Sequence, residues 1–183
     1  MSETIVGTTY ENLLSAIQGE TNATTKYQAF AAIAKTEGLD QIARLFECTA
    51  DAEKIHIDLE YQLAKAMNDA TELPTGEAPK ETPSKENLIA AACGEIYETS
   101  DMYPKFIERA YEENEVKAAA IFTRAKLAEG YHAELYMNVF NSINDLDEAS
   151  YHLCPVCGYI RKGDEDTSNC PVCGAKASSF KAY

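Results

Sequence analysis

Long segments rich in alanine, leucine and isoleucine dominate the chain, and polar residues interrupt them at helical intervals. In one segment, Ile42, Leu45 and Phe46 recur at steps of three and four, which places them on one face of a helix. Patterns of this kind predict four long helices, over about residues 10–36, 39–67, 85–111 and 115–143. The chain is therefore expected to be mainly α, a four-helix bundle followed by a short tail that is not helical.

The expected helix ends carry local signals. Thr8 and Glu11 have the spacing of a capping box at the start of the first helix, and Gly38 marks its end. Asn114 is expected to cap the start of the fourth helix. Pro104 falls inside the third helix, where it should bend the helix or open its hydrogen-bond ladder.

Residues 68–84 contain three prolines, a glycine and many polar groups, which predicts a long extended connection. A bundle with a crossover explains this length, because the chain must return along the whole bundle before the third helix starts. The sequence leaves open whether this connection stays within its own subunit or exchanges helices with a partner. After Ser150 the composition changes to Cys, Pro and Gly, so two domains are expected, 1–148 and 149–183.

Composition narrows the class of protein. The 183 residues suit one domain of ordinary size and a small appendage. A net charge of −14 argues against nucleic-acid binding, which needs a basic surface. No apolar run approaches the roughly 18 residues of a membrane span. The first residues lack a basic region followed by an apolar run, so we expect a cytoplasmic location with reduced cysteines.

Two Glu-x-x-His motifs carry candidate metal chemistry. Glu53 and His56 lie three residues apart, as do Glu129 and His132, and this spacing puts both side chains on one helix face. Either motif alone would more often arise by chance than bind a metal. Counting from the predicted turns, however, brings acidic residues of all four helices to one level, roughly 25 Å from each turn at the α-helical rise.

One Glu from each of two helices, Glu20 and Glu98, completes the ligand set of ferritin-like di-iron or di-manganese proteins. Carboxylates and imidazole suit iron or manganese and leave positions open for small oxygen ligands. Glu95 has no counterpart in the first helix pair and lies one turn before Glu98. We expect Glu95 to be an extra carboxylate ligand; the alternative is a salt-bridged surface residue.

The tail contains two near-identical Cys-Pro-Val-Cys-Gly loops, which begin at Cys154 and Cys170. Each loop can place two thiolates on one ion, so the loops together predict a tetrahedral site. Its ligands would be Cys154, Cys157, Cys170 and Cys173. Four thiolates suit zinc or iron, and on spacing alone a zinc ribbon is the commoner answer. Cys48 and Cys93 are expected to be small buried residues on helices.

Together these residues resemble the rubrerythrin family, over nearly the whole chain and in the usual order, with the rubredoxin-like knuckle last. Tyr27 and Tyr103 match the positions of tyrosines that this family has near its di-iron centre. The resemblance implies a ferritin-like bundle that holds two non-haem irons, and a knuckle that holds one redox-active iron, with zinc possible in isolated protein.

The implied activity is that of a non-haem peroxidase that reduces hydrogen peroxide to water, with the metal ligands, Tyr27 and Tyr103 around the reacting centre. Electrons would come from an NADH-dependent reductase, often through rubredoxin. The resemblance also implies a homodimer or tetramer, in which one subunit's knuckle iron lies near the other's di-iron site. An iron would exchange His56 for Glu95 as its oxidation state changes.

Two alternatives remain open on the sequence. A ferroxidase would oxidise ferrous iron with oxygen or peroxide, and it needs no module for electron delivery. An iron-binding or storage protein would carry a structural zinc ribbon and assemble into a hollow shell of many subunits.

Overall fold

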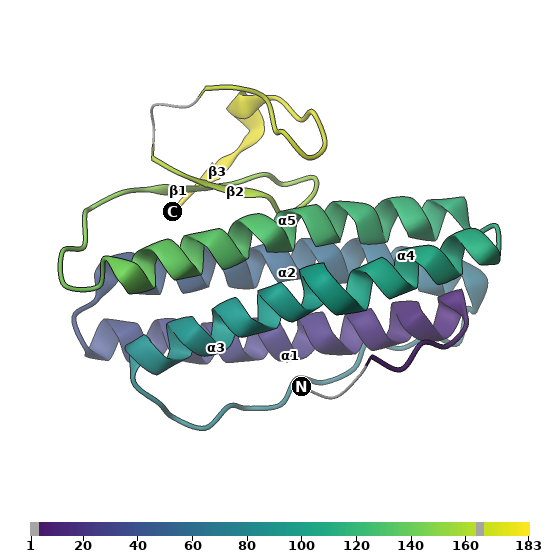
Figure 1. Ribbon diagram of the computed structural model, residues 1–183, viewed down its shortest axis with the longest axis horizontal. Coiled ribbons are helices and arrows are strands. Elements are labelled where there is room, and N and C mark those ends of the chain that lie inside the picture. The colour runs from purple at the N-terminus through teal and green to yellow at the C-terminus, as the bar shows by residue number, and fades with distance from the viewer. Residues whose placement is uncertain (1–3, 164–166) are drawn as a thin grey trace.

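The computed structural model describes residues 4–163 and 167–183. Four long rods lie side by side as a bundle, and a small module covers one side of it (Figure 1). The rods are α1 (Thr9–Thr36), α2 (Asp40–Met67), α3 (Ser84–Tyr97) continued by the π-helix η1 (Glu98–Met102) and α4 (Tyr103–Glu112), and α5 (Val116–Asn141). The predicted fold class is confirmed. None of the helices in the described ranges is long and apolar enough to cross a membrane.

The local signals fix the helix ends with one exception. The Thr8 N–H donates to Glu11 Oε2 at 2.7 Å, and the Thr8 side chain accepts from the Glu11 N–H, which confirms the capping box. Gly38 follows α1 with φ of 73°. The prediction that Asn114 caps α5 is wrong, because Asn114 has φ of 61° and its N–H donates to the Tyr111 carbonyl. Asparagine tolerates this left-handed conformation, so it terminates α4 instead.

The connection between α2 and α3, residues 68–83, runs back along the bundle as an extended chain (Figure 1). Gln18 and Asn22 of α1 hold it: Gln18 Nε2 donates to the Thr75 carbonyl at 3.3 Å, and Asn22 Oδ1 accepts from the Glu77 N–H at 3.1 Å. At Gly76 an added Cβ would lie 2.7 Å from the Thr21 carbonyl oxygen, so only glycine allows this close approach. The predicted crossover is present.

The third rod is opened just before Pro104. Over Glu98–Met102 the chain forms a π-helix, in which the Tyr103 N–H donates to the Glu98 carbonyl, five residues back. Pro104 has no N–H to donate to the preceding turn, so the α-helical ladder cannot continue through it. The predicted interruption is confirmed, and its form is one extra residue inserted between α3 and α4.

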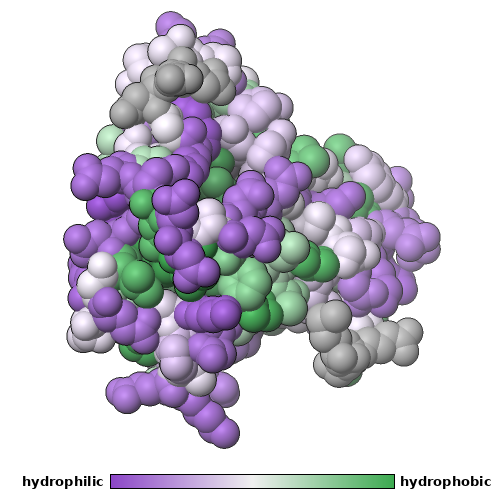
Figure 2. Space-filling view, turned by 60° about the vertical axis from the view of Figure 1, so that its left-hand side comes forward, coloured by the Kyte–Doolittle hydropathy of each residue, from purple (hydrophilic) through white to green (hydrophobic). Residues whose placement is uncertain are grey.

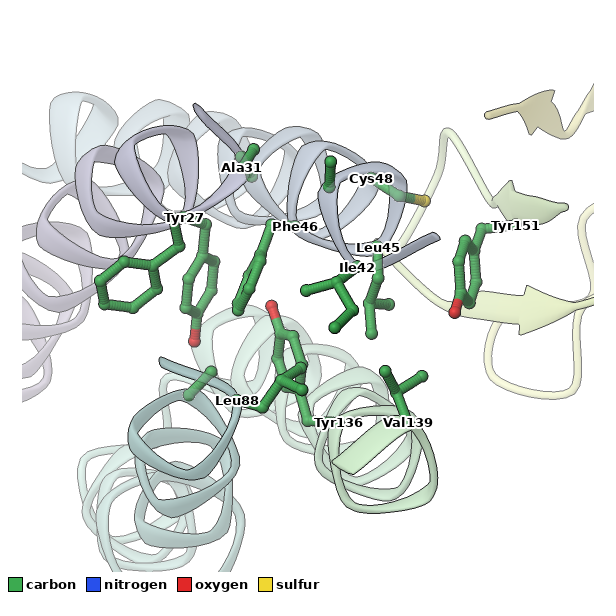
Figure 3. Close-up of a cluster of buried hydrophobic side chains, with 14 of the residues drawn as sticks. Tyr27, Ala31, Ile42, Leu45, Phe46, Cys48, Leu88, Tyr136, Val139 and Tyr151 are labelled. Atoms are coloured by element: carbon green, nitrogen blue, oxygen red, sulfur yellow. The ribbon is translucent and has the colours of Figure 1, made fainter. Parts of the chain in front are cut away.

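The bundle interior holds two apolar clusters with acidic residues between them. One cluster contains Phe46, Tyr27 and Tyr136, with ring centroids 5.3–5.9 Å apart (Figure 3). The other contains Leu13, Phe106 and other side chains toward the α4 end. On every rod the predicted metal ligands fall between the two clusters. Cys48 is buried as expected, whereas Cys93 is exposed on α3 and that prediction is wrong.

The C-terminal module is a three-stranded antiparallel sheet of order β2-β1-β3, with a 3₁₀ turn at Ala177–Ser179. Its strands are β1 (Tyr151–Leu153), β2 (Ile160–Lys162) and β3 (Lys181–Ala182). It lies against α2 and α5 (Figure 1), and in Figure 2 it projects from a face on which hydrophilic side chains prevail. Lys181 Nζ binds Asp51 of α2 at 2.7 Å, so β3 is tied directly to the bundle.

Candidate metal centres

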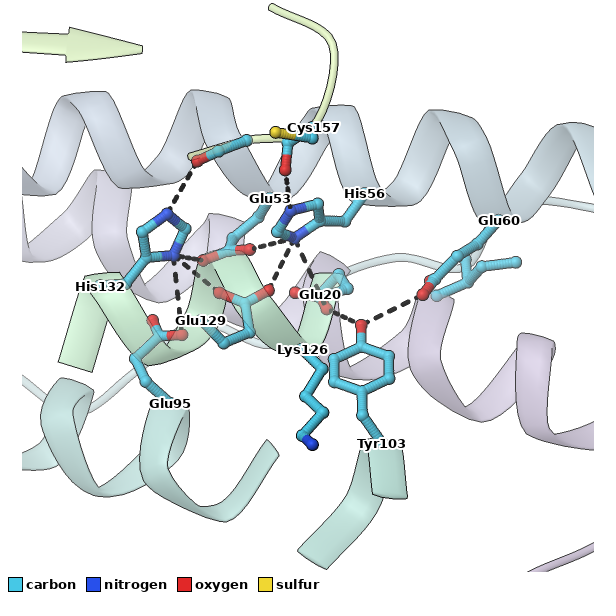
Figure 4. A network of polar contacts seen from close by, with 12 residues as sticks. Glu20, Glu53, His56, Glu60, Glu95, Tyr103, Lys126, Glu129, His132 and Cys157 are labelled. Atoms are coloured by element: carbon cyan, nitrogen blue, oxygen red, sulfur yellow. Dashed lines mark hydrogen bonds and ion pairs between the residues drawn. The ribbon is translucent and has the colours of Figure 1, made fainter. Parts of the chain in front are cut away.

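Acidic and imidazole side chains from four rods converge in the middle of the bundle (Figure 4). Their donor atoms form two groups, each with all atoms within 4.8 Å of one another. The groups are Glu20, Glu53, His56 and Glu129, and Glu53, Glu95, Glu129 and His132. All six side chains are at most 1% exposed. Glu53 and Glu129 belong to both groups, so each can bridge two neighbouring cations.

The two histidines are oriented by the C-terminal module. His56 Nε2 lies 3.1 Å from the Cys157 carbonyl oxygen, and His132 Nε2 lies 2.8 Å from that of Gly158. A carbonyl can only accept, so each Nε2 carries the hydrogen and each neutral ring turns the lone pair of Nδ1 inward. Both Nδ1 atoms then face Glu129 oxygens at 2.7 Å. A lone pair against a carboxylate is repulsive unless a proton or a metal ion lies between them.

Charge in this interior is unbalanced. Burial, followed by the neighbouring carboxylates, raises the pKa of Glu20, Glu53 and Glu129 well above the ordinary value. Apart from the two Nδ1 atoms that face Glu129, both oxygens of Glu129 and one oxygen each of Glu20, Glu53 and Glu95 have no hydrogen-bond partner within the described chain. Buried carboxylates cost several kcal/mol unless they are neutralised. Hard oxygen donors with two imidazoles therefore fit a pair of cations such as iron.

Two tyrosines bind the outer carboxylates. Tyr27 Oη donates to Glu95 Oε1 at 2.5 Å, and Tyr103 Oη donates to Glu20 Oε1. Burial opposes ionisation of Glu95, but hydrogen bonds that include those with His132 and Tyr27 lower its pKa overall. The structure thus brings both predicted tyrosines to the metal site, one beside each outer carboxylate.

The structure places Glu95 inside a donor group, as expected of an extra ligand, and Glu98 outside both groups. Glu95 belongs to the group of His132 and does not face His56. Glu98 is only partly buried, lies in the π-helix and belongs to neither group. Its Oε1 lies 4.0 Å from where a Cβ on Gly19 would be, on the Glu20 side. Glu95 and Glu98 lie one turn apart on the same rod, and the π-helix begins at Glu98, so counting residues along an α-helix does not separate the two positions.

Glu60 is a buried acid near this site that the sequence reading missed. It is fully buried, and its Oε1 lies 3.1 Å from Tyr103 Oη (Figure 4). Its spacing was a usable signal, because residue 60 follows His56 by four positions and therefore lies on the same buried helix face.

The four predicted cysteines converge in the C-terminal module. Cys154 Sγ lies 3.6 Å from Cys173 Sγ, and Cys157 Sγ lies 3.5 Å from Cys170 Sγ. A tetrahedron with metal–sulfur bonds of about 2.3 Å has edges of about 3.8 Å, so one ion fits between the four sulfurs. Gly158 and Gly174 end the two loops, each with φ of 76°. We call this module the knuckle.

The knuckle lies on the two-metal site of its own chain. At Gly158 an added Cβ would be 2.4 Å from His56 Nε2, so the loop backbone touches the imidazole ring. The resemblance implied that the knuckle of one subunit approaches the site of the other. In this structure the contact is made within one chain, through the carbonyls of Cys157 and Gly158.

A ferritin-like bundle with a two-metal carboxylate–histidine site and a rubredoxin-like four-cysteine knuckle defines the class of this protein. The rubrerythrin family model matches residues 11–140, and the model described as the rubrerythrin rubredoxin-like domain matches residues 152–181. The chain belongs to the rubrerythrin family.

Relatives match along the whole chain. Nigerythrin of Nitratidesulfovibrio vulgaris is 55% identical over 182 residues, covering 100% of this chain and 90% of the relative. Rubrerythrin of Porphyromonas gingivalis is 32% identical over 190 residues, covering 99% and 93%. The solved structure of fully reduced, all-ferrous nigerythrin has a TM-score of 0.97 at 54% identity, covering 100% of this chain and 90% of that one.

The metal-free protein should lose stability as pH rises. The pKa values of Glu20, Glu53 and Glu129 are higher in the folded state than their ordinary value of 4.5. Their contribution to the free energy of unfolding is therefore fully present below pH 4.5 and is lost as the pH rises above it. Although burial lowers it, Glu129 raises the pKa of His56 to about 10, so the contribution of His56 is lost as pH rises through that value. The pKa of Glu95 is lowered, so its contribution to stability increases with pH, but the three carboxylates with raised pKa values outweigh it.

Metal replaces these protons, so the rise in Tm on metal loading should be larger at about pH 8 than at about pH 5.5. Thermal unfolding of chelated and iron-loaded protein across pH measures this difference. A metal-free protein whose Tm increases toward pH 8 would contradict the assignment.

Gly158→Ala should displace the knuckle, because its Cβ would collide with His56. Gly174→Ala is the matched control: it has the same φ of 76°, but nothing lies within 4 Å of its added Cβ. The backbone strain of about 1–2 kcal/mol is common to both, and overpacking should cost Gly158→Ala a further 1–3 kcal/mol or so. Denaturant unfolding compares them, and equal losses would argue against the contact.

Proposed function

We propose that this protein is a peroxidase that reduces hydrogen peroxide to water at the two-metal site, with electrons that enter through the knuckle. The overall reaction takes one H₂O₂, two protons and two electrons to two waters. NADH-linked reductase or rubredoxin is the proposed electron source. The observation that carries the proposal is the direct hydrogen bonding of both site histidines to the knuckle loop.

The residues present fit a ferrous pair, and Glu53 and Glu129 would contribute to both metal positions because they belong to both donor groups. When bound, such a pair supplies two electrons to the O–O bond and stabilises charge on the separating oxygens. Glu20, Glu95 and the two histidines would complete the ligand sets. The surrounding apolar clusters keep bulk water away from the reacting oxygens.

The chain supplies a short route between the metal sites. Cys157 is a knuckle thiolate, and its own carbonyl accepts the hydrogen bond from His56 Nε2. Only the covalent bonds of one residue and one hydrogen bond therefore separate a knuckle sulfur from a ligand of the two-metal site. A structural zinc ribbon would need no such contact, so the arrangement favours electron delivery over ferroxidase or storage activity.

Glu98 is the carboxylate suited to any exchange with His56. It lies on the Glu20 side of the site, whereas Glu95 is committed to His132 and Tyr27. Burial, followed by the charge of Glu20, raises the pKa of Glu98 well above the ordinary value. Glu98 can therefore remain neutral beside the site and bind as a carboxylate when oxidation raises the positive charge of a bound iron.

Removing one knuckle thiolate with Cys173→Ser should separate the two halves of the reaction. Steady-state peroxide turnover with NADH, reductase and rubredoxin should fall to background, because electrons no longer reach the site. A single oxidation of the fully ferrous protein by peroxide should keep its rate within about twofold. Stopped-flow and steady-state assays measure both; unchanged steady-state turnover would reject the knuckle as the entry point.

Glu95→Ala and Glu98→Ala should differ in metal content. Without Glu95 the His132 position loses a ligand from its four-donor group, so about one iron per chain should be lost. Glu98→Ala should keep both irons and slow peroxide turnover instead. Iron analysis with matched activity assays tests this, and an equal loss of iron in both variants would refute the reassignment.

A further inference from the structure

Glu60 is a buried acid that forms no ion pair within the described chain. Its side chain is fully buried, and it lies among apolar residues of α2 such as Ile57 and Ala64. Within the described chain its only hydrogen-bond partner is Tyr103 of α4, and its Oε2 has none. Burial, followed by the charge of Glu20, raises the pKa of Glu60 well above the ordinary value.

Counting protons around Tyr103 gives the charge state of Glu60. The Tyr103 hydroxyl lies within hydrogen-bond distance of both Glu20 Oε1 and Glu60 Oε1. It has one proton, and a metal-binding Glu20 is a carboxylate that can only accept it. The 3.1 Å contact with Glu60 is then a hydrogen bond only when Glu60 carries a proton and donates it to the tyrosine oxygen.

We propose that Glu60 stores a proton beside the two-metal site and delivers it through the Tyr103 hydroxyl to the oxygen that departs when peroxide is cleaved. This inference rests on the proposed peroxidase function. Glu60 is a proton-donating residue one step behind Tyr103, and Tyr103 is the group that touches the reacting oxygen.

The proposed proton transfer conserves atoms and charge. The Tyr103 O–H bond breaks and its proton forms an O–H bond on the departing oxygen, while the proton of Glu60 moves to the tyrosine oxygen. Tyr103 begins and ends neutral, and Glu60 ends as a carboxylate. One of the two protons that peroxide reduction consumes is thus supplied, the second comes from solvent, and Glu60 regains its proton from solvent between turnovers. The two electrons are those of the ferrous pair.

Glu60→Gln and Glu60→Leu separate proton donation from positioning. The glutamine amide can still donate a hydrogen bond to Tyr103 but holds no transferable proton, whereas leucine provides neither. Asp58→Asn is the matched control, because it removes an exposed carboxylate two residues away on the same helix. Iron content and circular dichroism establish that each variant is folded and loaded; if Glu60→Leu fails to fold, Glu60→Gln decides.

The first readout is independent of activity. Because Glu98 also carries a proton, Glu98→Ala serves as the wild-type background for this readout. In iron-loaded protein the ligand carboxylates are ionised, so the remaining infrared C=O stretch of a neutral carboxyl group should arise from Glu60. It should be present in wild type and Asp58→Asn and missing in Glu60→Gln. Its persistence in Glu60→Gln, or its absence from wild type, would overturn the proposal.

The second readout is the oxidation rate of the fully ferrous protein by peroxide, in H₂O and in D₂O. Glu60→Gln and Glu60→Leu should both be about a hundredfold slower than wild type. Tyr103→Phe combined with Glu60→Gln should be no slower than Tyr103→Phe alone, because the two residues act in series. A wild-type rate in Glu60→Gln would show that Glu60 only positions Tyr103. Failure of wild type itself to reduce peroxide would reject the proposed function instead.

Discussion

The structure depends on neutralising the carboxylates enclosed between two apolar clusters. Glu20, Glu53, Glu95 and Glu129 are all fully buried, and several of their oxygens have no hydrogen-bond partner within the described chain. Their mutual repulsion and desolvation would each cost several kcal/mol without a counter-charge. The helices therefore assemble around a site that is complete only with cations, and both apolar clusters keep the rods in register on either side of it.

The same requirement explains why the knuckle lies where it does. An inward-facing Nδ1 needs an outward-facing N–H on the opposite side of each imidazole, and that N–H needs an acceptor. The carbonyls of Cys157 and Gly158 provide the acceptors for His56 and His132. One set of hydrogen bonds thus fixes the histidine tautomers, docks the module and joins the two metal sites.

Most of the fold and most of the metal ligands were predictable, because the spacing of apolar residues and the types of the ligand residues can both be read from a single sequence. The Glu-x-x-His spacing places its two ligands on one helix face, and level placement on four helices identified the site. Which of Glu95 and Glu98 belongs to a four-donor group was not predictable from helix levels, because the two lie one turn apart on the same rod and a π-helix begins at Glu98. Asn114 was misassigned because asparagine suits both an N-cap and a left-handed turn. The docking of the knuckle depends on carbonyl groups, which leave no mark in the side-chain pattern.

We infer that the buried ligands and four thiolates hold three redox-active irons in one chain. The most direct measurement is the visible spectrum of purified protein, recorded before and after reduction, with iron and zinc counted per chain. We expect about three irons per chain and a ferric–thiolate band that bleaches on reduction. Zinc in the knuckle with no such band, or a bundle that binds no iron, would contradict it.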